Sequence, residues 1–266
     1  MLATSGSSMA RRDVAAEVIA RLLKQLATGT IAARDRAAQR LYLLGDPRGN
    51  AGVLALAEHR DPMRRARGVW ALSVVRPPGS KALLLRRSGD NAPAVRREVA
   101  RALGLLRSGK KGAKVLRRML GDKVGAVRQA AVFALARLGV VGLSGLRQAL
   151  RAKPLVLRLL AVRGLAASKQ PLARALLRRA TRRNREPVRL LAATALERKG
   201  DPLGARTLIT LATAGTAKGV RLQAITTLGK VKTAQARRAL RRLVRVRDQQ
   251  LRRAAADALA QQRGSR

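Results

Sequence analysis

One pattern recurs eight times at a nearly constant spacing, and this repetition restricts the fold more than any other feature of the sequence. An arginine is followed three positions later by a small residue or valine, and seven positions later by leucine in every case. Residues three and seven positions apart share one face of an α-helix, so each match predicts an amphipathic helix. The arginines lie 30 to 32 positions apart and are Arg34, Arg65, Arg96, Arg128, Arg158, Arg189, Arg221 and Arg252. A fixed period of this length predicts stacked structural repeats.

A further helical segment precedes each match. Asp-Pro pairs such as Asp46-Pro47 and Asp201-Pro202 separate the segments, and such residues end one helix and begin the next. No alternating pattern typical of strands competes with this interpretation. We therefore expect an all-α solenoid of about eight helical hairpins with a period of about 31 residues. A single solenoid domain is expected over 13–262, with a disordered leader at 1–12 and a short tail at 263–266.

The helical repeats resemble a known family. DKVGAVRQAAVFAL at 122–135 looks like the second helix of a short HEAT repeat of the phycobilisome-lyase type, and the stretches at 90–103 and 184–196 match it too. The resemblance covers nearly all of 13–262. It implies a HEAT-like solenoid in which the eight repeated arginines form a structural ladder of hydrogen-bonded guanidinium groups. Because these motif residues are structural, the resemblance indicates a fold and not a function.

In the resembled family an aspartate caps the second helix and pairs with the ladder arginine of the same repeat. This aspartate is kept as Asp61, Asp90, Asp122 and Asp248. Six positions before the later ladder arginines it is replaced by Ala152, Arg183 and Gly215. We therefore expect Arg158, Arg189 and Arg221 to lack a carboxylate, which leaves a place for an external anion.

Composition excludes several classes of protein. The chain has no cysteine and a single histidine, so neither a disulfide framework nor a thiolate or multi-histidine metal site is expected. Only three aromatic residues are present, too few for the stacking platforms of single-strand binders. No run of 18 apolar residues occurs, so no membrane insertion is expected. Arginine in excess of lysine, with abundant alanine and glycine, favours a bacterial source. The absence of cysteine fits a reducing compartment, so a cytoplasmic location is expected, with nucleoid association if the partner is DNA.

Charge is the strongest functional signal. Lys and Arg number 58 against 14 Asp and Glu, which gives a net charge of +44. The 63 residues from Lys123 to Arg185 contain 15 basic residues and no acidic one. Self-repulsion at such density opposes a compact state, so a polyanionic partner is expected.

Two sets of basic residues are candidates for phosphate contact. One set lies on the second helices, away from the core, where the resembled fold has its concave surface. The other consists of arginine doublets near the ends of first helices, which would form rows about 9–10 Å apart, comparable with phosphate spacing. The candidate nucleic-acid-binding residues are Arg97, Arg101, Arg137, Arg163, Arg178, Arg179, Arg182, Arg183, Arg198 and Lys230.

Three functions are compatible with these features. The first is sequence-independent binding of nucleic acid, duplex DNA rather than RNA, through phosphates. The second is a scaffold for an acidic protein. The third is an enzyme. The repeats resemble HEAT-like alkylpurine DNA glycosylases, for which Trp70, Glu98 and Asp257 are candidates that we expect to lie far apart, and a HEAT-type deoxyhypusine hydroxylase, whose several His-Glu metal pairs His59 cannot supply. We expect no enzymatic activity, no cofactor and no metal.

Overall fold

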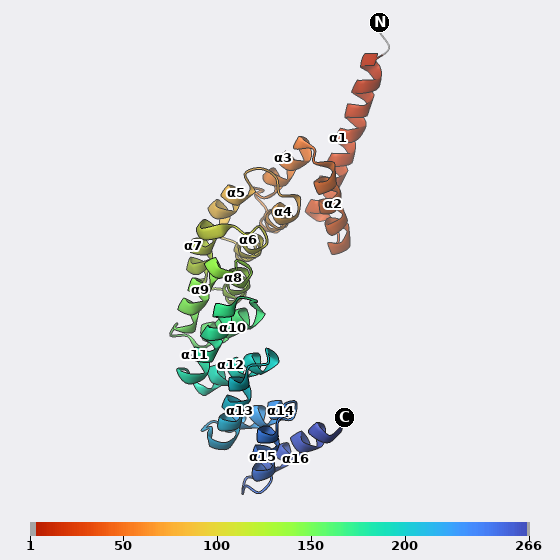
Figure 1. Cartoon of the computed structure of the whole chain (residues 1–266). Coiled ribbons are helices and arrows are strands. Elements are labelled where there is room, and N and C mark those ends of the chain that lie inside the picture. Colours follow the sequence, from red (N-terminus) through yellow and green to blue (C-terminus); the bar gives the residue numbers. More distant parts are fainter. Residues whose placement is uncertain (1–3, 265–266) are drawn as a thin grey trace. The chain divides into compact units, whose positions relative to one another are not determined.

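The computed structural model describes residues 4–264 and the side chains of 14–263, and within that part of the chain it contains helices and turns but no strand. The protein is an all-α solenoid of helical hairpins, as the repeat predicts (Figure 1). The helices are α1 (Thr4–Thr28), α2 (Ile31–Leu44), α3 (Pro47–Leu56), α4 (Pro62–Val75), α5 (Ser80–Arg87), α6 (Pro93–Leu105), α7 (Gly109–Met119), α8 (Gly125–Arg137), α9 (Val140–Leu150), α10 (Leu155–Ala167), α11 (Pro171–Arg182), α12 (Glu186–Arg198), α13 (Pro202–Ala214), α14 (Lys218–Leu228), α15 (Ala234–Leu243) and α16 (Gln249–Gly264).

The chain divides into two compact units, Met1–Val141 and Gly142–Arg266, which we call unit 1 and unit 2. Helix α1 begins at Thr4 and so takes in most of the segment expected to be a leader, while residues 1–3 lie outside the described part. Helix α16 ends at Gly264, and residues 265–266 likewise lie outside it. The boundaries of leader, repeat domain and tail stay predictions.

Within each unit the second helices of successive repeats pack side by side. In unit 1, α2 contacts α4, α4 contacts α6 and α6 contacts α8. In unit 2, α10 contacts α12, α12 contacts α14 and α14 contacts α16. First helices close each hairpin, as α3 does against α4 and α13 against α14. The second helices therefore form a continuous layer within a unit, and their outward positions share one face.

The repeated sequence pattern corresponds to a fixed place in the fold. Every ladder arginine is the fourth residue of its helix, from Arg34 in α2 to Arg252 in α16. The leucines seven positions later are at most 2% exposed from Leu41 to Leu228, and Leu259 is partly buried. The prediction that this helical face forms the core is confirmed.

The small residue three positions after the arginine allows close packing between helices. At Gly68 in α4, an added Cβ would lie 2.3 Å from the backbone nitrogen of Ala57, which follows α3. Gly104 in α6 has a similar role, because a Cβ there would lie 2.8 Å from the Cα of Ala134 in α8. Contacts this short with backbone atoms are forbidden, so these helices approach closely only because no side chain stands between them.

Candidate nucleic-acid interface

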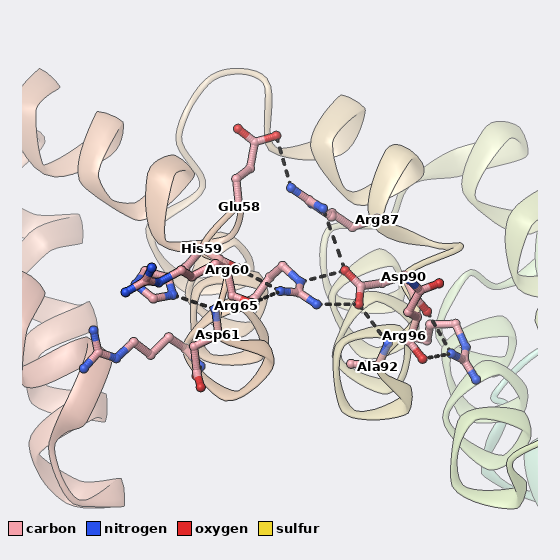
Figure 2. Close-up of polar contacts among 11 residues, drawn as sticks. Glu58, His59, Arg60, Asp61, Arg65, Arg87, Asp90, Ala92 and Arg96 are labelled. Carbon is pink, nitrogen blue, oxygen red and sulfur yellow. Dashed lines mark hydrogen bonds and ion pairs between the residues drawn. The ribbon is translucent and has the colours of Figure 1, made fainter.

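Arg65 shows how the ladder is built (Figure 2). Its Nε donates to Oδ2 of Asp90 at 2.7 Å, and its Nη2 donates to Oδ1 at 2.9 Å. Its Nη1 donates to the carbonyl oxygens of His59 and Arg60, which precede its own helix. Oδ1 of Asp90 also accepts from the backbone N–H of Ala92 at 3.0 Å, so the carboxylate holds the turn that leads into the next second helix. One guanidinium thus joins two successive repeats.

Arg96 repeats this geometry one hairpin later. Its Nε and Nη2 donate to Asp122 at 2.7 and 3.0 Å, and Asp122 accepts from the N–H of Val124 at 2.9 Å. The hydrogen bond from Arg96 holds the pKa of Asp122 below its ordinary value against the opposing effect of burial. Burial raises the pKa of Asp90, but hydrogen bonds from Arg65 and Ala92 outweigh it and leave that pKa lowered.

The pairing corrects one expectation. The aspartate was expected to pair with the arginine of its own repeat, but Asp90 and Asp122 pair with the arginines of the preceding repeats. The reason is geometric. The turn before a second helix lies beside the ladder guanidinium of the preceding repeat, which packs against it. The position that serves each arginine is therefore the one six residues before the next ladder arginine. By this rule, the residue that stands in the place of the aspartate is His59 for Arg34 and Arg183 for Arg158.

At two of the positions without a carboxylate, a buried guanidinium nitrogen is left without a hydrogen-bond partner. His59 keeps the bond to the backbone two residues on, since its Nδ1 accepts from the N–H of Asp61 at 2.9 Å, while Asp61 itself caps α4. His59 supplies no carboxylate, and Nε of Arg34 is buried without a hydrogen-bond partner. Nε of Arg158 is buried without a partner in the same way.

A different carboxylate compensates for the loss at Gly215. Glu186, at the start of α12, accepts from the N–H groups of Thr216 and Ala217 at 2.8 and 3.0 Å, just before α14. These amides hold the pKa of Glu186 below its ordinary value. Arg189 and Arg221, which were expected to lack a carboxylate, donate through Nε to the carbonyl oxygens of Thr181 and Ala212 instead. The sequence analysis did not identify Glu186 as this substitute. The signal available in the sequence was an acidic residue about one repeat before Gly215, which stands in the place of the aspartate.

In unit 1, the outward face of the second helices forms a cavity of about 580 Å³. Its lining includes three of the predicted basic residues, Arg97, Arg101 and Arg137, from α6 and α8. It also includes Trp70 and Glu98, so the expectation that these two lie far apart is wrong: their repeats are adjacent and both side chains reach the same hollow. Phe133 and Gln129 complete the α8 side.

Glu98 is engaged by its own helix. Its Oε1 accepts from Nε of Arg97 and Nη1 of Arg101, each at 3.1 Å, and the residue is only 7% exposed. Two of the three arginines of this cavity are therefore partly neutralised. Asp257, the other acidic candidate, is exposed on α16 in unit 2.

In unit 2 the basic candidates lie in two places. Arg163 on α10, Arg198 at the end of α12 and Lys230 just after α14 are all exposed, one in each of three successive repeats. The second place is the C-terminal end of α11. Its candidate residues are Arg178, Arg179, Arg182 and Arg183, and all four are exposed.

Arg178 differs from its three neighbours. Its Nε donates to Oδ2 of Asp201 at 2.7 Å, and the Asp201 side chain is almost fully buried. Arg178 is therefore paired with a carboxylate from outside the acid-free stretch, because Asp201 belongs to the following repeat. Burial raises the pKa of Asp201, but the hydrogen bonds from Arg178 and from the backbone N–H of Leu203 keep it lowered.

Neither a metal-binding cluster nor a membrane-spanning helix is found within 4–264. The described residues contain no group of three or more histidine, aspartate or glutamate side chains that could hold a metal ion. None of the described helices is long and apolar enough to cross a membrane.

Comparisons with known proteins place the fold. Residues 80–142 match a family of HEAT repeats. The E. coli protein YibA, known from its X-ray structure, is 16% identical with a TM-score of 0.56, and the match covers 98% of both chains. A chain from the complex of Kap95p with RanGDP is 14% identical with a TM-score of 0.55, covering 91% of this chain and 38% of that one. The CpcE–CpcF complex of phycocyanin lyase from Nostoc sp. PCC7120 is 17% identical with a TM-score of 0.43, covering 90% and 92%.

No curated protein matches the sequence. At such low identity, likeness to solved structures concerns the fold alone. The matched family covers α5 to α8, the region that contains the Arg96–Asp122 pair. The repeated arginine and leucine extend the same hairpin over the other repeats. The chain has the fold of a HEAT-like solenoid, and its segment 80–142 matches the HEAT-repeat family itself.

Proposed function

We propose that this protein is a non-enzymatic solenoid that binds polyanions, and that its main ligand is duplex DNA bound without regard to sequence. The observation that carries the proposal is the set of exposed basic residues in unit 2. Arg163, Arg198 and Lys230 follow the second-helix layer, and Arg179, Arg182 and Arg183 end α11. With 58 basic and 14 acidic residues, ion pairing within the chain leaves most of these charges for an external partner.

The chemistry of these side chains favours phosphate contact over base readout. Guanidinium groups bind phosphate oxygens with two parallel N–H bonds, whereas stacking on bases needs aromatic surfaces. The aromatic residues number three, and Trp70 and Phe133 line the cavity of unit 1. Phosphate contacts position a protein on nucleic acid but carry no sequence information.

A protein-interaction scaffold is the second candidate. Solenoids of this kind present extended surfaces to other proteins, and the Kap95p structure that the fold resembles was solved with RanGDP. For this chain, such a partner would need a strongly acidic surface. A base-excising enzyme has weaker support, since Glu98 shares a cavity with Trp70 but is held by two arginines.

One binding experiment separates the first two candidates. The full chain is titrated with duplex DNA, single-stranded DNA, RNA and polyglutamate at two salt concentrations. The proposal expects duplex DNA to bind most tightly, with equal affinity for unrelated sequences and a steep loss of affinity at high salt. Tighter binding of polyglutamate than of duplex DNA at matched charge would favour the scaffold and reject the proposal.

A further inference from the structure

A small cavity in unit 2 combines several arginines with no acid. It lies between the ends of α9 and α11 and the start of α10, and has a volume of about 330 Å³. Its lining includes Arg147, Arg151, Arg158, Arg179 and Arg183, and no aspartate or glutamate. This is ample room for more than one water molecule, which takes up about 30 Å³ in the liquid. Five guanidinium groups around one hollow repel one another unless an anion lies among them.

Arg158 gives the cavity a defined binding point. Its Nη2 donates to the carbonyl oxygen of Lys153 at 3.3 Å, but its buried Nε has no partner. In Arg65 and Arg96 the same Nε atom donates to a carboxylate at 2.7 Å. A buried charged donor without an acceptor is unfavourable, so this atom marks a missing acceptor.

The missing acceptor is the ladder aspartate of the next repeat. In the register of Asp90 and Asp122, the residue that corresponds to Arg158 is Arg183. The second role of that aspartate is also vacant, because an arginine side chain at position 183 cannot accept from the N–H of Arg185 as Asp90 accepts from Ala92. An acidic group is therefore absent from a position where it would bind both a guanidinium and a backbone N–H just before α12.

We propose that this cavity binds a phosphate group, which takes the place of the ladder aspartate. Its oxygen atoms would accept from Nε of Arg158 and from the backbone N–H of Arg185, as Asp90 accepts from Arg65 and Ala92. Arg147, Arg151, Arg179 and Arg183 would complete the coordination, since arginine matches phosphate geometry better than any other side chain. The site goes beyond general attraction of DNA, because it holds one phosphate group at a defined point.

The test compares the full chain in inorganic phosphate and in chloride at equal ionic strength. Thermal unfolding should occur at higher temperature in phosphate, and calorimetry should show saturable binding to one site. Arg183→Asp should restore the ladder pair with Arg158. This variant should unfold at a higher temperature than wild type in chloride and should lose the additional stabilisation by phosphate.

Arg182→Asp is the matched control. It makes the same change in charge on the neighbouring position, outside the cavity, and should keep the stabilisation by phosphate. If Arg183→Asp does not fold, as judged by circular dichroism, the double variant Arg147→Gln/Arg151→Gln replaces it, since both side chains are exposed. That variant should bind inorganic phosphate at least tenfold more weakly.

Two results would overturn the proposal. One is equal stability of the wild type in phosphate and chloride, and the other is unchanged stabilisation by phosphate in Arg183→Asp. Both measurements are made without DNA. The phosphate site can therefore be disproved while the proposed DNA binding stands, and DNA binding can be disproved while the phosphate site stands. Adding duplex DNA to the phosphate-bound protein then identifies the source of the group. Displacement of phosphate assigns the site to the nucleic-acid backbone, and simultaneous binding assigns it to free phosphate.

Discussion

Arg96 and Asp122 join two repeats of unit 1 through a two-point ion pair, in which each side chain is only 10% exposed. Asp122→Ala would remove both bonds to Arg96 and the bond from the N–H of Val124. Breaking a buried pair from one side leaves an uncompensated charge, and we expect a loss of roughly 3 kcal/mol in the free energy of unfolding. Urea unfolding followed by the fluorescence of Trp70, the single tryptophan and a residue of unit 1, measures it.

Asp35→Ala provides the comparison for that experiment. Asp35 is an exposed carboxylate on α2, and its removal should change stability by less than about 0.5 kcal/mol. Equal losses in the two variants would mean that net charge, and not the pair with Arg96, determines the effect.

The lowered pKa values of Asp90, Asp122 and Asp201 predict a loss of stability in acid. Each carboxylate has a lower pKa in the folded protein than in the unfolded chain, where it is about 3.9. The unfolded state therefore binds more protons as the pH falls. The stabilising contribution is complete above about pH 5 and is lost as the pH falls through the lowered folded values. Urea unfolding at pH 7, 5 and 3 should show it, with a smaller change for Asp122→Ala; equal pH dependence in both proteins would contradict the assignment.

Gly68 and Gly219 should respond in opposite directions to the same substitution. In Gly68→Ala the new Cβ would lie 2.3 Å from a backbone nitrogen, and the displacement of α3 from α4 should cost about 2 kcal/mol despite the gain in helix propensity. In Gly219→Ala the Cβ would meet nothing within 4 Å, so propensity alone should stabilise the protein by about 0.5 kcal/mol. Thermal unfolding followed by circular dichroism compares them. A stabilising Gly68→Ala would show that the two helices are not in close contact.

The core and the hairpin repeat could be predicted because they depend on local spacing. A leucine seven positions after an arginine lies on a fixed helical face, and Leu72, Leu103 and Leu135 are fully buried as expected. The partner of each arginine could not be predicted, because it depends on how one repeat stacks on the next. Asp90 lies six positions before Arg96 and 25 after Arg65, and only the three-dimensional packing selects Arg65.

The candidate site could be predicted only as a set of residue types. Composition indicates an anion-binding surface, but the neutralising contacts come from distant repeats. Arg178 lies 23 positions from Asp201, and no sequence neighbourhood of α11 contains that carboxylate. Trp70 and Glu98 line one cavity because α4 packs against α6. Their separation of 28 positions along the chain does not by itself predict that contact.

Base excision should be absent. A glycosylase would need a carboxylate free to act at the sugar, but the Glu98 carboxylate is bound by Arg97 and Arg101. We therefore expect no release of 3-methyladenine or 7-methylguanine from alkylated duplex DNA above the protein-free control. Chromatography of the released bases measures this. Release that disappears in Glu98→Gln and in Trp70→Ala would establish the enzyme and refute the non-enzymatic proposal.

The salt dependence of duplex binding should identify the surface that contacts phosphates. Each phosphate contact contributes about −0.9 to the slope of log affinity against log salt, so six to eight contacts would give about −5 to −7. Replacing Arg179, Arg182 and Arg183 together by Gln should flatten the slope by about two if two of them touch phosphate. Arg178 is left unchanged, because its bond to Asp201 already compensates its charge.

The matched variant replaces Arg163, Arg198 and Lys230 by Gln. These residues lie one per repeat, on or just after the second helices, so fewer of them can reach the same stretch of backbone. We therefore expect the slope to flatten by less than about one. Both variants should keep the helical circular dichroism of the wild type, since glutamine is a good helix former. Both should weaken unrelated sequences alike, because phosphate contacts carry no base information. An unchanged slope in the α11 variant would remove this helix end from the interface, and a loss confined to one sequence would indicate base readout.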